Sequence, residues 1–306
     1  MNLRMALRVA STLLLAIEIG SASGAALVTR EDAAGAYARG DYKTALQVMR
    51  RLADNGDMEA AAMIGFIYVQ GPDSIRDCEQ ALHWSRKAAD RGVPEGQHNI
   101  GVMYENGTCV KQDYTQAAQW YELAAAKGHI GAISNLGTLY LAGQGVKQDP
   151  RMAVSLFRRA AAAGDAIAQS NLGMAYINGA GVPVDERQGF SLVKAAATSK
   201  TPWQYFNLGV AYEQGLGTPR NPEEAVKCYR IAAENGHASA QVALGMMFAS
   251  GKGTKPDIPR GYMWIALAAE QGSDFAKEKL AYFVSQASPR QIAEGRRLLA
   301  EMKRNN

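Results

Sequence analysis

The chain has 306 residues, and its 33 Lys and Arg against 29 Asp and Glu give a formal net charge of +4 at pH 7. Charges of both signs are interspersed, and this mild balance does not favour a nucleic-acid partner. Three cysteines are too few for a disulfide framework, and no C-x-x-C spacing points to a metal site. We therefore expect no nucleic acid, no cofactor and no metal.

The N-terminus has the layout of a secretory signal peptide. Arg4 and Arg8 precede a short apolar run at 9–17, and a stretch of small residues follows at 20–26. The apolar run is too short to span a bilayer, which takes about 20 residues. We expect residues 1–25 to be removed and the mature chain to be periplasmic or secreted. An uncleaved anchor or a buried helix is the alternative.

The rest of the chain repeats itself. Ser134–Val146 reads SNLGTLYLAGQGV, and 36 residues later Ser170–Val182 reads SNLGMAYINGAGV. A fixed period of this length is typical of repeat architectures. The same register holds for glycines at Gly65, Gly101, Gly137, Gly173, Gly209 and Gly245. It also holds for polar residues at Asp41, Asp77, Asp113, Asp149, Asp185, Asn221 and Asp257.

One period predicts a helix–loop–helix hairpin, as residues 128–164 illustrate. His129–Ala142 has apolar residues at helical spacing, and Gly143 suits the left-handed position that ends a helix. Asp149 is a good N-cap for the second helix. Gly137 lies in the middle of the first helix, where glycine costs roughly 1 kcal/mol against alanine. We expect this glycine to let a neighbouring helix approach closely.

Such hairpins bury their apolar faces only by stacking on one another, so the predicted fold class is all-α, an α/α superhelix or solenoid with a 36-residue period. We expect a single solenoid domain over residues 26–306. Its parts are a degenerate first hairpin at 31–56, six repeats at 57–272 and C-terminal capping helices at 273–306.

The repeated phrase A-x-x-N-L-G-x-x-Y-x-x-G-x-G-V, followed by D-x-x-x-A-x-x-W-x-x-x-A-A-x-x-G, resembles the Sel-one-like repeat family, whose fold is similar to tetratricopeptide repeats. Ala132–Gly164 and Gly96–Gly128 carry it most fully. The resemblance implies a right-handed superhelix of helix pairs and a role as a scaffold or adaptor for other proteins. Exported bacterial members serve in envelope signalling, polysaccharide export, motility and host contact, and the resemblance does not choose among these.

The fifth repeat departs from the family pattern. Lys200 stands where other repeats have a glycine before the first helix, and Gln204 stands where they have a small residue. Aromatic residues then follow at Trp203 and Phe206. We expect the hairpin junction there to be kinked or reset.

The first helices of stacked hairpins are expected to line a concave groove. By analogy with tetratricopeptide repeats, the lining positions lie at −6, −3, +1, +4 and +5 from the mid-helix glycine, on one helical stripe. This first-helix stripe contains no Lys or Arg and four Glu among thirty positions. The candidate partner-binding residues are Trp203, Phe206, Val210, Glu213, Met174, Ile177, Met246, Val102, Glu95, His98, Glu105 and Phe66.

Trp203 and Phe206 are the leading candidates for a binding hot spot, since aromatic anchors are favoured at interfaces. The alternative is that the solenoid coils tightly and buries the stripe between repeats. We expect a monomeric, non-catalytic scaffold that binds a protein or peptide, with no membrane segment after signal cleavage. A scaffold for polysaccharide export, with aromatic side chains stacked on sugars, is the second hypothesis.

A hydrolase is the remote alternative. Ser191 and Lys194 match S-x-x-K, the nucleophile motif of penicillin-recognising enzymes, but the S-D-N and K-T-G motifs do not follow. Both residues fall on variable positions of a second helix, which favours a solvated helix face.

The cysteines and histidines complete the expectations. Cys228 replaces a tryptophan of the period, so we expect a buried thiol. Cys78 and Cys109 lie in adjacent repeats and are either bridged or free. His129 is expected to cap a first helix, as is His237. His98 is expected to stand alone on its helix.

Overall fold

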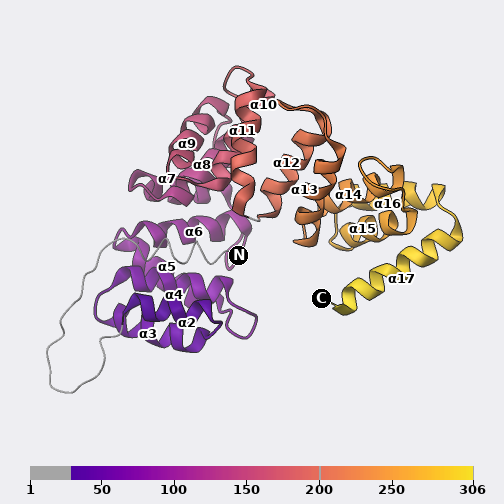
Figure 1. Ribbon diagram of the computed structural model, residues 1–306. Coiled ribbons are helices and arrows are strands. Elements are labelled where there is room, and N and C mark those ends of the chain that lie inside the picture. The colour runs from indigo at the N-terminus through magenta and orange to yellow at the C-terminus, as the bar shows by residue number, and fades with distance from the viewer. Residues whose placement is uncertain (1–28, 200, 306) are drawn as a thin grey trace. The chain divides into compact units, whose positions relative to one another are not determined.

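The computed structural model describes residues 29–199 and 201–305, and in these residues the chain forms sixteen α-helices, one short 3-10 helix and no strand. The predicted signal peptide, residues 1–25, lies outside the described part. The helices divide into two compact units, Met1–Ala160 and Ala161–Asn306 (Figure 1). Consecutive helices pair as hairpins, which confirms the predicted fold class.

In the first unit, even-numbered helices are first helices of hairpins and odd-numbered helices are second helices. They are α2 (Arg30–Ala38), α3 (Tyr42–Asp54), α4 (Met58–Gln70), α5 (Cys78–Asp90), α6 (Pro94–Asn106), α7 (Tyr114–Ala126) and α8 (Ile130–Ala142). Helix α9 (Pro150–Ala162) follows and contains the boundary between the units.

The second unit continues the same alternation. Its helices are α10 (Ala166–Asn178), α11 (Glu186–Ala196), η2 (Ala197–Ser199), α12 (Pro202–Gln214), α13 (Pro222–Glu234), α14 (Ala238–Ser250), α15 (Ile258–Glu270), α16 (Asp274–Gln286) and α17 (Pro289–Asn305).

The periodic acidic residues begin the second helices. Asp77 accepts a hydrogen bond from the Gln80 backbone N–H at 3.0 Å, and Asp149 accepts from those of Arg151 and Met152, each at 3.0 Å. These bonds satisfy N–H groups that the first turn of a helix leaves unpaired. The prediction of an N-cap at this position is confirmed.

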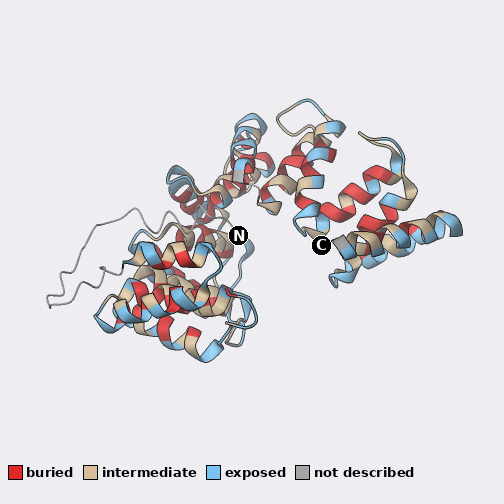
Figure 2. Cartoon of the chain, turned by 60° about the horizontal axis from the view of Figure 1, so that its bottom comes forward, coloured by how far each residue is buried: buried red, intermediate tan, exposed pale blue. Residues whose placement is uncertain are grey.

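The mid-helix glycines lie where the two helices of a hairpin cross. A Cβ on Gly137 would lie 2.7 Å from the Phe157 ring, and a Cβ on Gly173 would lie 2.7 Å from the Gly189 carbonyl oxygen. Contacts this short exclude any side chain, so the predicted role in close packing is confirmed. Figure 2 shows the buried residues gathered where neighbouring helices face each other within each unit.

An asparagine two residues before the mid-helix glycine links neighbouring repeats, a role that the sequence analysis missed. Asn99 Nδ2 donates to the Ala62 carbonyl oxygen at 2.9 Å, and Asn207 Nδ2 donates to Ser170 Oγ at 2.9 Å. Each bond joins the first helices of two consecutive hairpins. An intramolecular hydrogen bond of this kind contributes about 1 kcal/mol.

The junction before the fifth repeat is reset, as expected. Helix α11 has 11 residues and is followed by the 3-10 turn η2, whereas α10 and α12 on either side each have 13 residues. Lys200 lies outside the described residues. Gln204, in place of a small residue, is fully buried in α12.

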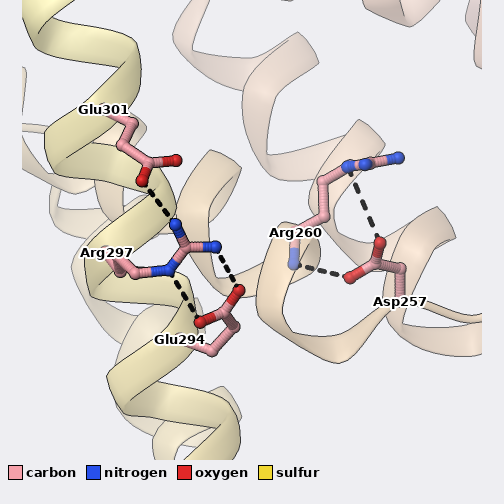
Figure 3. Close-up of polar contacts among 5 residues, drawn as sticks. All are labelled: Asp257, Arg260, Glu294, Arg297 and Glu301. Atoms are coloured by element: carbon pink, nitrogen blue, oxygen red, sulfur yellow. Dashed lines mark hydrogen bonds and ion pairs between the residues drawn. The ribbon is translucent and has the colours of Figure 1, made fainter.

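The last two helices close the second unit. Helix α15 contacts both α16 and α17, and Lys303 on α17 reaches Glu270 on α15 at 2.6 Å. On the solvent side of α17, Arg297 pairs with Glu294 and Glu301 (Figure 3). Exposed pairs of this kind contribute little to stability.

Cys78 and Cys109 form a disulfide with a Cα–Cα distance of 4.9 Å, which settles the question left open by the sequence. Cys78 is the first residue of α5, and Cys109 lies after α6 with a φ of +65°. The next repeat has Gly145 at the place of Cys109, and a Cβ there would lie 2.1 Å from the backbone of Tyr114, the first residue of α7. The bridge therefore replaces a tight loop-to-helix contact between neighbouring repeats.

Removing the bridge is expected to destabilise the chain. Its sequence separation of 31 residues corresponds to about 3–4 kcal/mol of loop-closure free energy. Cys78→Ser/Cys109→Ser should lose this amount in urea unfolding under oxidising conditions. Cys78→Ser/Cys109→Gly should lose about 1 kcal/mol less, because glycine adopts positive φ without strain. Unfolding midpoints equal to that of the native chain would contradict the constraint.

Candidate functional site

The twelve candidate residues of the first-helix stripe differ widely in exposure. Trp203 is 50% exposed, Met246 is 36% exposed and Ile177 is only 6% exposed. The remaining nine are partly buried, namely Phe66, Glu95, His98, Val102, Glu105, Met174, Phe206, Val210 and Glu213. The stripe therefore reaches the surface only in part.

The expectation of an accessible side chain is wrong for Ile177. Its side chain belongs to a buried cluster with Val193 and Leu208. A Cβ on Gly189 would lie 2.7 Å from Ile177, so α11 packs too closely on α10 for Ile177 to stay at the surface. Stripe positions three residues before the mid-helix glycine are also buried in four repeats, at Ala62, Ser134, Ser170 and Val242.

A set of polar side chains, the polar cluster, forms around the second repeat from Glu105, Tyr121, Asn135, His98 and His129. The Tyr121 hydroxyl donates to the Glu105 carboxylate, and Asn135 Nδ2 donates to the Tyr121 hydroxyl at 3.1 Å. Asn135 Nδ2 also lies 3.4 Å from His98 Nε2, and the His98 ring stacks on His129 with centroids 4.4 Å apart. His98 is therefore not alone, because α8 of the next hairpin brings two partners to it.

The environment sets the charges of the polar cluster. Burial raises the pKa of Glu105 more than the Tyr121 hydrogen bond lowers it. Burial, followed by the neighbouring His129, lowers the pKa of His98 to about 3. Burial also lowers the pKa of His129, whose Nδ1 accepts from the Ala132 N–H at 3.1 Å as the predicted helix cap. Both rings are neutral near pH 7, and Glu105 is the ionisable acid among them.

A second set, the aromatic cluster, forms around the fifth repeat from Trp203, Phe206, Glu213, Tyr229 and His237. The Tyr229 hydroxyl donates to Glu213 at 2.8 Å, and the Phe206 ring stacks on His237 with centroids 4.7 Å apart. The Trp203 ring lies 5.1 Å from His237 and 6.0 Å from Phe206. His237 caps α14, as predicted. The half-exposed Trp203 side chain therefore packs against the rings of Phe206 and His237.

The two clusters are copies of one arrangement, three periods apart. Glutamate, tyrosine and capping histidine recur 108 residues apart as Glu105 and Glu213, Tyr121 and Tyr229, and His129 and His237. The other repeats have no tyrosine at the second of these positions, where they carry Ser85, Phe157, Val193 and Ile265. Comparing second helices along the chain would have revealed the pair.

The two clusters differ in whether a lysine pairs with the glutamate. Lys252 Nζ lies 2.8 Å from Glu213. Burial raises the pKa of Glu213, but hydrogen bonds from Lys252 and Tyr229 outweigh it and leave the pKa below its ordinary value. Glu105 has a raised pKa, and among the described residues it forms no ion pair.

The remaining reactive groups do not converge on a site. Ser191 and Lys194 are both exposed on α11, and Lys194 Nζ lies 6.0 Å from the Phe190 ring centre. Cys228 is buried, as predicted, and burial raises the pKa of its thiol to about 12, which makes it unreactive. In residues 29–199 and 201–305, no group of His, Cys, Asp or Glu could hold a metal ion.

Comparison with known proteins now identifies the architecture. The family model described as Sel1 repeat matches six segments, residues 59–93, 94–129, 130–165, 166–200, 205–237 and 238–273. The chain belongs to the Sel1 repeat family. The matched segments leave out residues 201–204, where the fifth repeat departs from the pattern.

Two solved structures show how far the likeness extends. A Sel1 repeat protein from Oxalobacter formigenes is 26% identical with a TM-score of 0.66, and the match covers 78% of this chain and 96% of that one. A protective antigen of uropathogenic Escherichia coli with an SLR fold is 34% identical with a TM-score of 0.60. That match covers 84% of this chain and 56% of the antigen, so this Sel1 repeat protein spans about half of that relative.

No curated protein matches the chain. Within the described residues of this Sel1 repeat protein, none of the helices has the length and apolarity needed to cross a membrane. Sel1 repeat proteins are generally protein–protein interaction scaffolds.

The histidines of the polar cluster predict acid sensitivity. The folded-state pKa of His98 lies below its ordinary value of 6.5, so the unfolded chain takes up the proton first on acidification. The resulting stabilisation is complete above pH 6.5 and falls as pH decreases towards about 3. His98→Phe, which copies Phe206, should flatten the slope of unfolding free energy by up to about 1.4 kcal/mol per pH unit.

Urea unfolding between pH 4 and 7 measures this slope. His83→Phe, at an exposed position on α5, is the matched control and should keep the native slope. Glu105 within the polar cluster and the neighbouring Glu95 remain unchanged in both variants. Equal slopes for His98→Phe and the native chain would contradict the assignment.

Proposed function

We propose that this Sel1 repeat protein is a non-catalytic scaffold that binds a protein or peptide partner on the exposed part of its first-helix stripe. The observation that carries the proposal is the half-exposed Trp203, held against the rings of Phe206 and His237. A tryptophan that is already ordered loses little side-chain entropy on binding and offers a large apolar surface. Such residues are favoured interface anchors.

The composition of the stripe supports a polypeptide partner. Its positions contain apolar and amide side chains and glutamates, with no lysine or arginine. Amides can bond the main chain of an extended segment, and apolar side chains can hold its anchors. The family's general role in protein–protein interaction agrees with this chemistry.

We further propose that the mature chain is an exported monomer, periplasmic or secreted. The N-terminal layout of basic, apolar and small residues supports export. The Cys78–Cys109 bridge supports it independently, because structural disulfides persist mainly in oxidising compartments.

Trp203→Ala is expected to weaken partner binding at least about 30-fold without unfolding the chain. Phe206 packs against the core of the second unit, so it is left intact. Loss of a central aromatic anchor typically costs at least 2 kcal/mol, about 30-fold in affinity. The partner is first captured from an envelope extract on the native chain, and its affinity for each variant is then measured by titration.

Phe275→Ala is the matched control, since Phe275 is 54% exposed on α16, outside the stripe. It should bind as the native chain does, and all three proteins should share one urea midpoint. Equal affinity of Trp203→Ala and the native chain would remove the stripe from consideration. A captured polysaccharide instead of a protein would favour sugar stacking on Trp203.

A further inference from the structure

The aromatic cluster shows how its glutamate is neutralised. Lys252 lies between Gly251 and Gly253 in the loop that follows α14, and its Nζ is 2.8 Å from Glu213 on α12. The lysine therefore reaches back from one repeat to the preceding first helix. Its ammonium group and the Tyr229 hydroxyl both bond the same carboxylate.

The polar cluster has the same loop without the cation. Gln144 follows Glu105 by 39 residues, the separation that also joins Glu213 and Lys252. The loops have matching backbones, because Gly143 and Gly145 have φ values of 70° and 69°, and Gly251 and Gly253 have 70° each. Gln144 therefore takes the place of Lys252 with a neutral side chain.

This substitution leaves Glu105 short of partners. A carboxylate offers about four acceptor positions, and the Tyr121 hydroxyl fills one of them. Glu105 is partly buried but retains solvent contact. A partly buried carboxylate gains most from a cationic donor, whose hydrogen bonds are about twice as strong as neutral ones.

The residues around Glu105 favour the binding of a positively charged group. Glu95 lies ten residues before Glu105 on α6, roughly 15 Å along the helix axis. Burial lowers the pKa of His129, and the negative charge of Glu95 partly opposes this effect. His98 and His129 are neutral near pH 7 and do not repel a cation. The first-helix stripe itself supplies no lysine or arginine.

We propose that the polar cluster binds a lysine or arginine side chain of the partner, with its cationic group at Glu105 in the place that Lys252 takes at Glu213. The inference rests on the proposed scaffold function and specifies the partner's chemistry. At the aromatic cluster the cation is internal, so the site beside Trp203 is left for an apolar group. Each cluster is taken by itself: the polar cluster selects a basic residue, and the aromatic cluster selects an apolar one.

The test uses the full chain and pools of acetylated, amidated hexapeptides. One position in each pool is fixed as lysine, arginine, norleucine or citrulline, and the others are mixed. Norleucine and citrulline reproduce the two side chains without their charge. The native chain should retain the lysine and arginine pools at least tenfold more than the neutral pools.

Two variants remove the preference by different routes. Glu105→Gln keeps an acceptor for the Tyr121 hydroxyl but loses the charge. Gln144→Lys supplies an internal ammonium group from an exposed loop position, and folding should be unaffected. Both should retain basic and neutral pools equally. Thr108→Lys is the control, because it adds the same charge at the equivalent loop position, where Val69 replaces the glutamate in the preceding first helix.

The outcomes separate this inference from the proposed function. The native chain could retain all pools equally, and Trp203→Ala could lose that retention. This result would overturn the cation site but support the scaffold. A preference unchanged in Glu105→Gln would also overturn it. Retention of no pool would count against both proposals. A preference lost in Glu105→Gln and Gln144→Lys, but kept in Thr108→Lys, is the expected result.

Discussion

The close approach of two helices at the mid-helix glycine is the constraint on which the other contacts depend. A Cβ at Gly137 would overlap the Phe157 ring, so the register between the two helices of a hairpin is fixed at this point. Once it is fixed, an asparagine two positions earlier faces the preceding repeat, as Asn99 and Asn207 do. The residue four positions later faces the second helix, where Glu105 meets Tyr121. Buried and available positions both follow from one backbone contact.

The period in the sequence predicts the hairpins, their caps and their boundaries, because these features are local and recur. It predicts the surface less well, because exposure depends on contacts made by single residues. Gly189 draws α11 onto α10 and buries Ile177, although the same stripe position in the next repeat holds the partly exposed Glu213. His98 looks isolated along its own helix, and its ring contacts come from Tyr121 on α7 and from His129 at the start of the next hairpin.

The Cys78–Cys109 disulfide is a second feature that the sequence period alone does not predict. Spacing alone left Cys78 and Cys109 either bridged or free. The equivalent pair in the next repeat, Tyr114 and Gly145, comes so close that no Cβ fits between them. Reading the cysteines as a substitution in a repeated contact, rather than as two isolated thiols, gives the pairing a physical basis.

Substitutions at equivalent positions give the repeats locally different surfaces within one architecture. Each repeat contacts mainly its neighbours, so a substitution in one loop changes the local site and leaves the stacking intact. Lysine at 252 pairs with Glu213, whereas Gln144 stands at the equivalent position for Glu105, which forms no ion pair among the described residues. Phe206 stacks on His237 in the aromatic cluster. His98, at the equivalent position of the polar cluster, contacts the Asn135 amide. A few substitutions at equivalent positions are therefore sufficient to give two copies of one arrangement different chemistry.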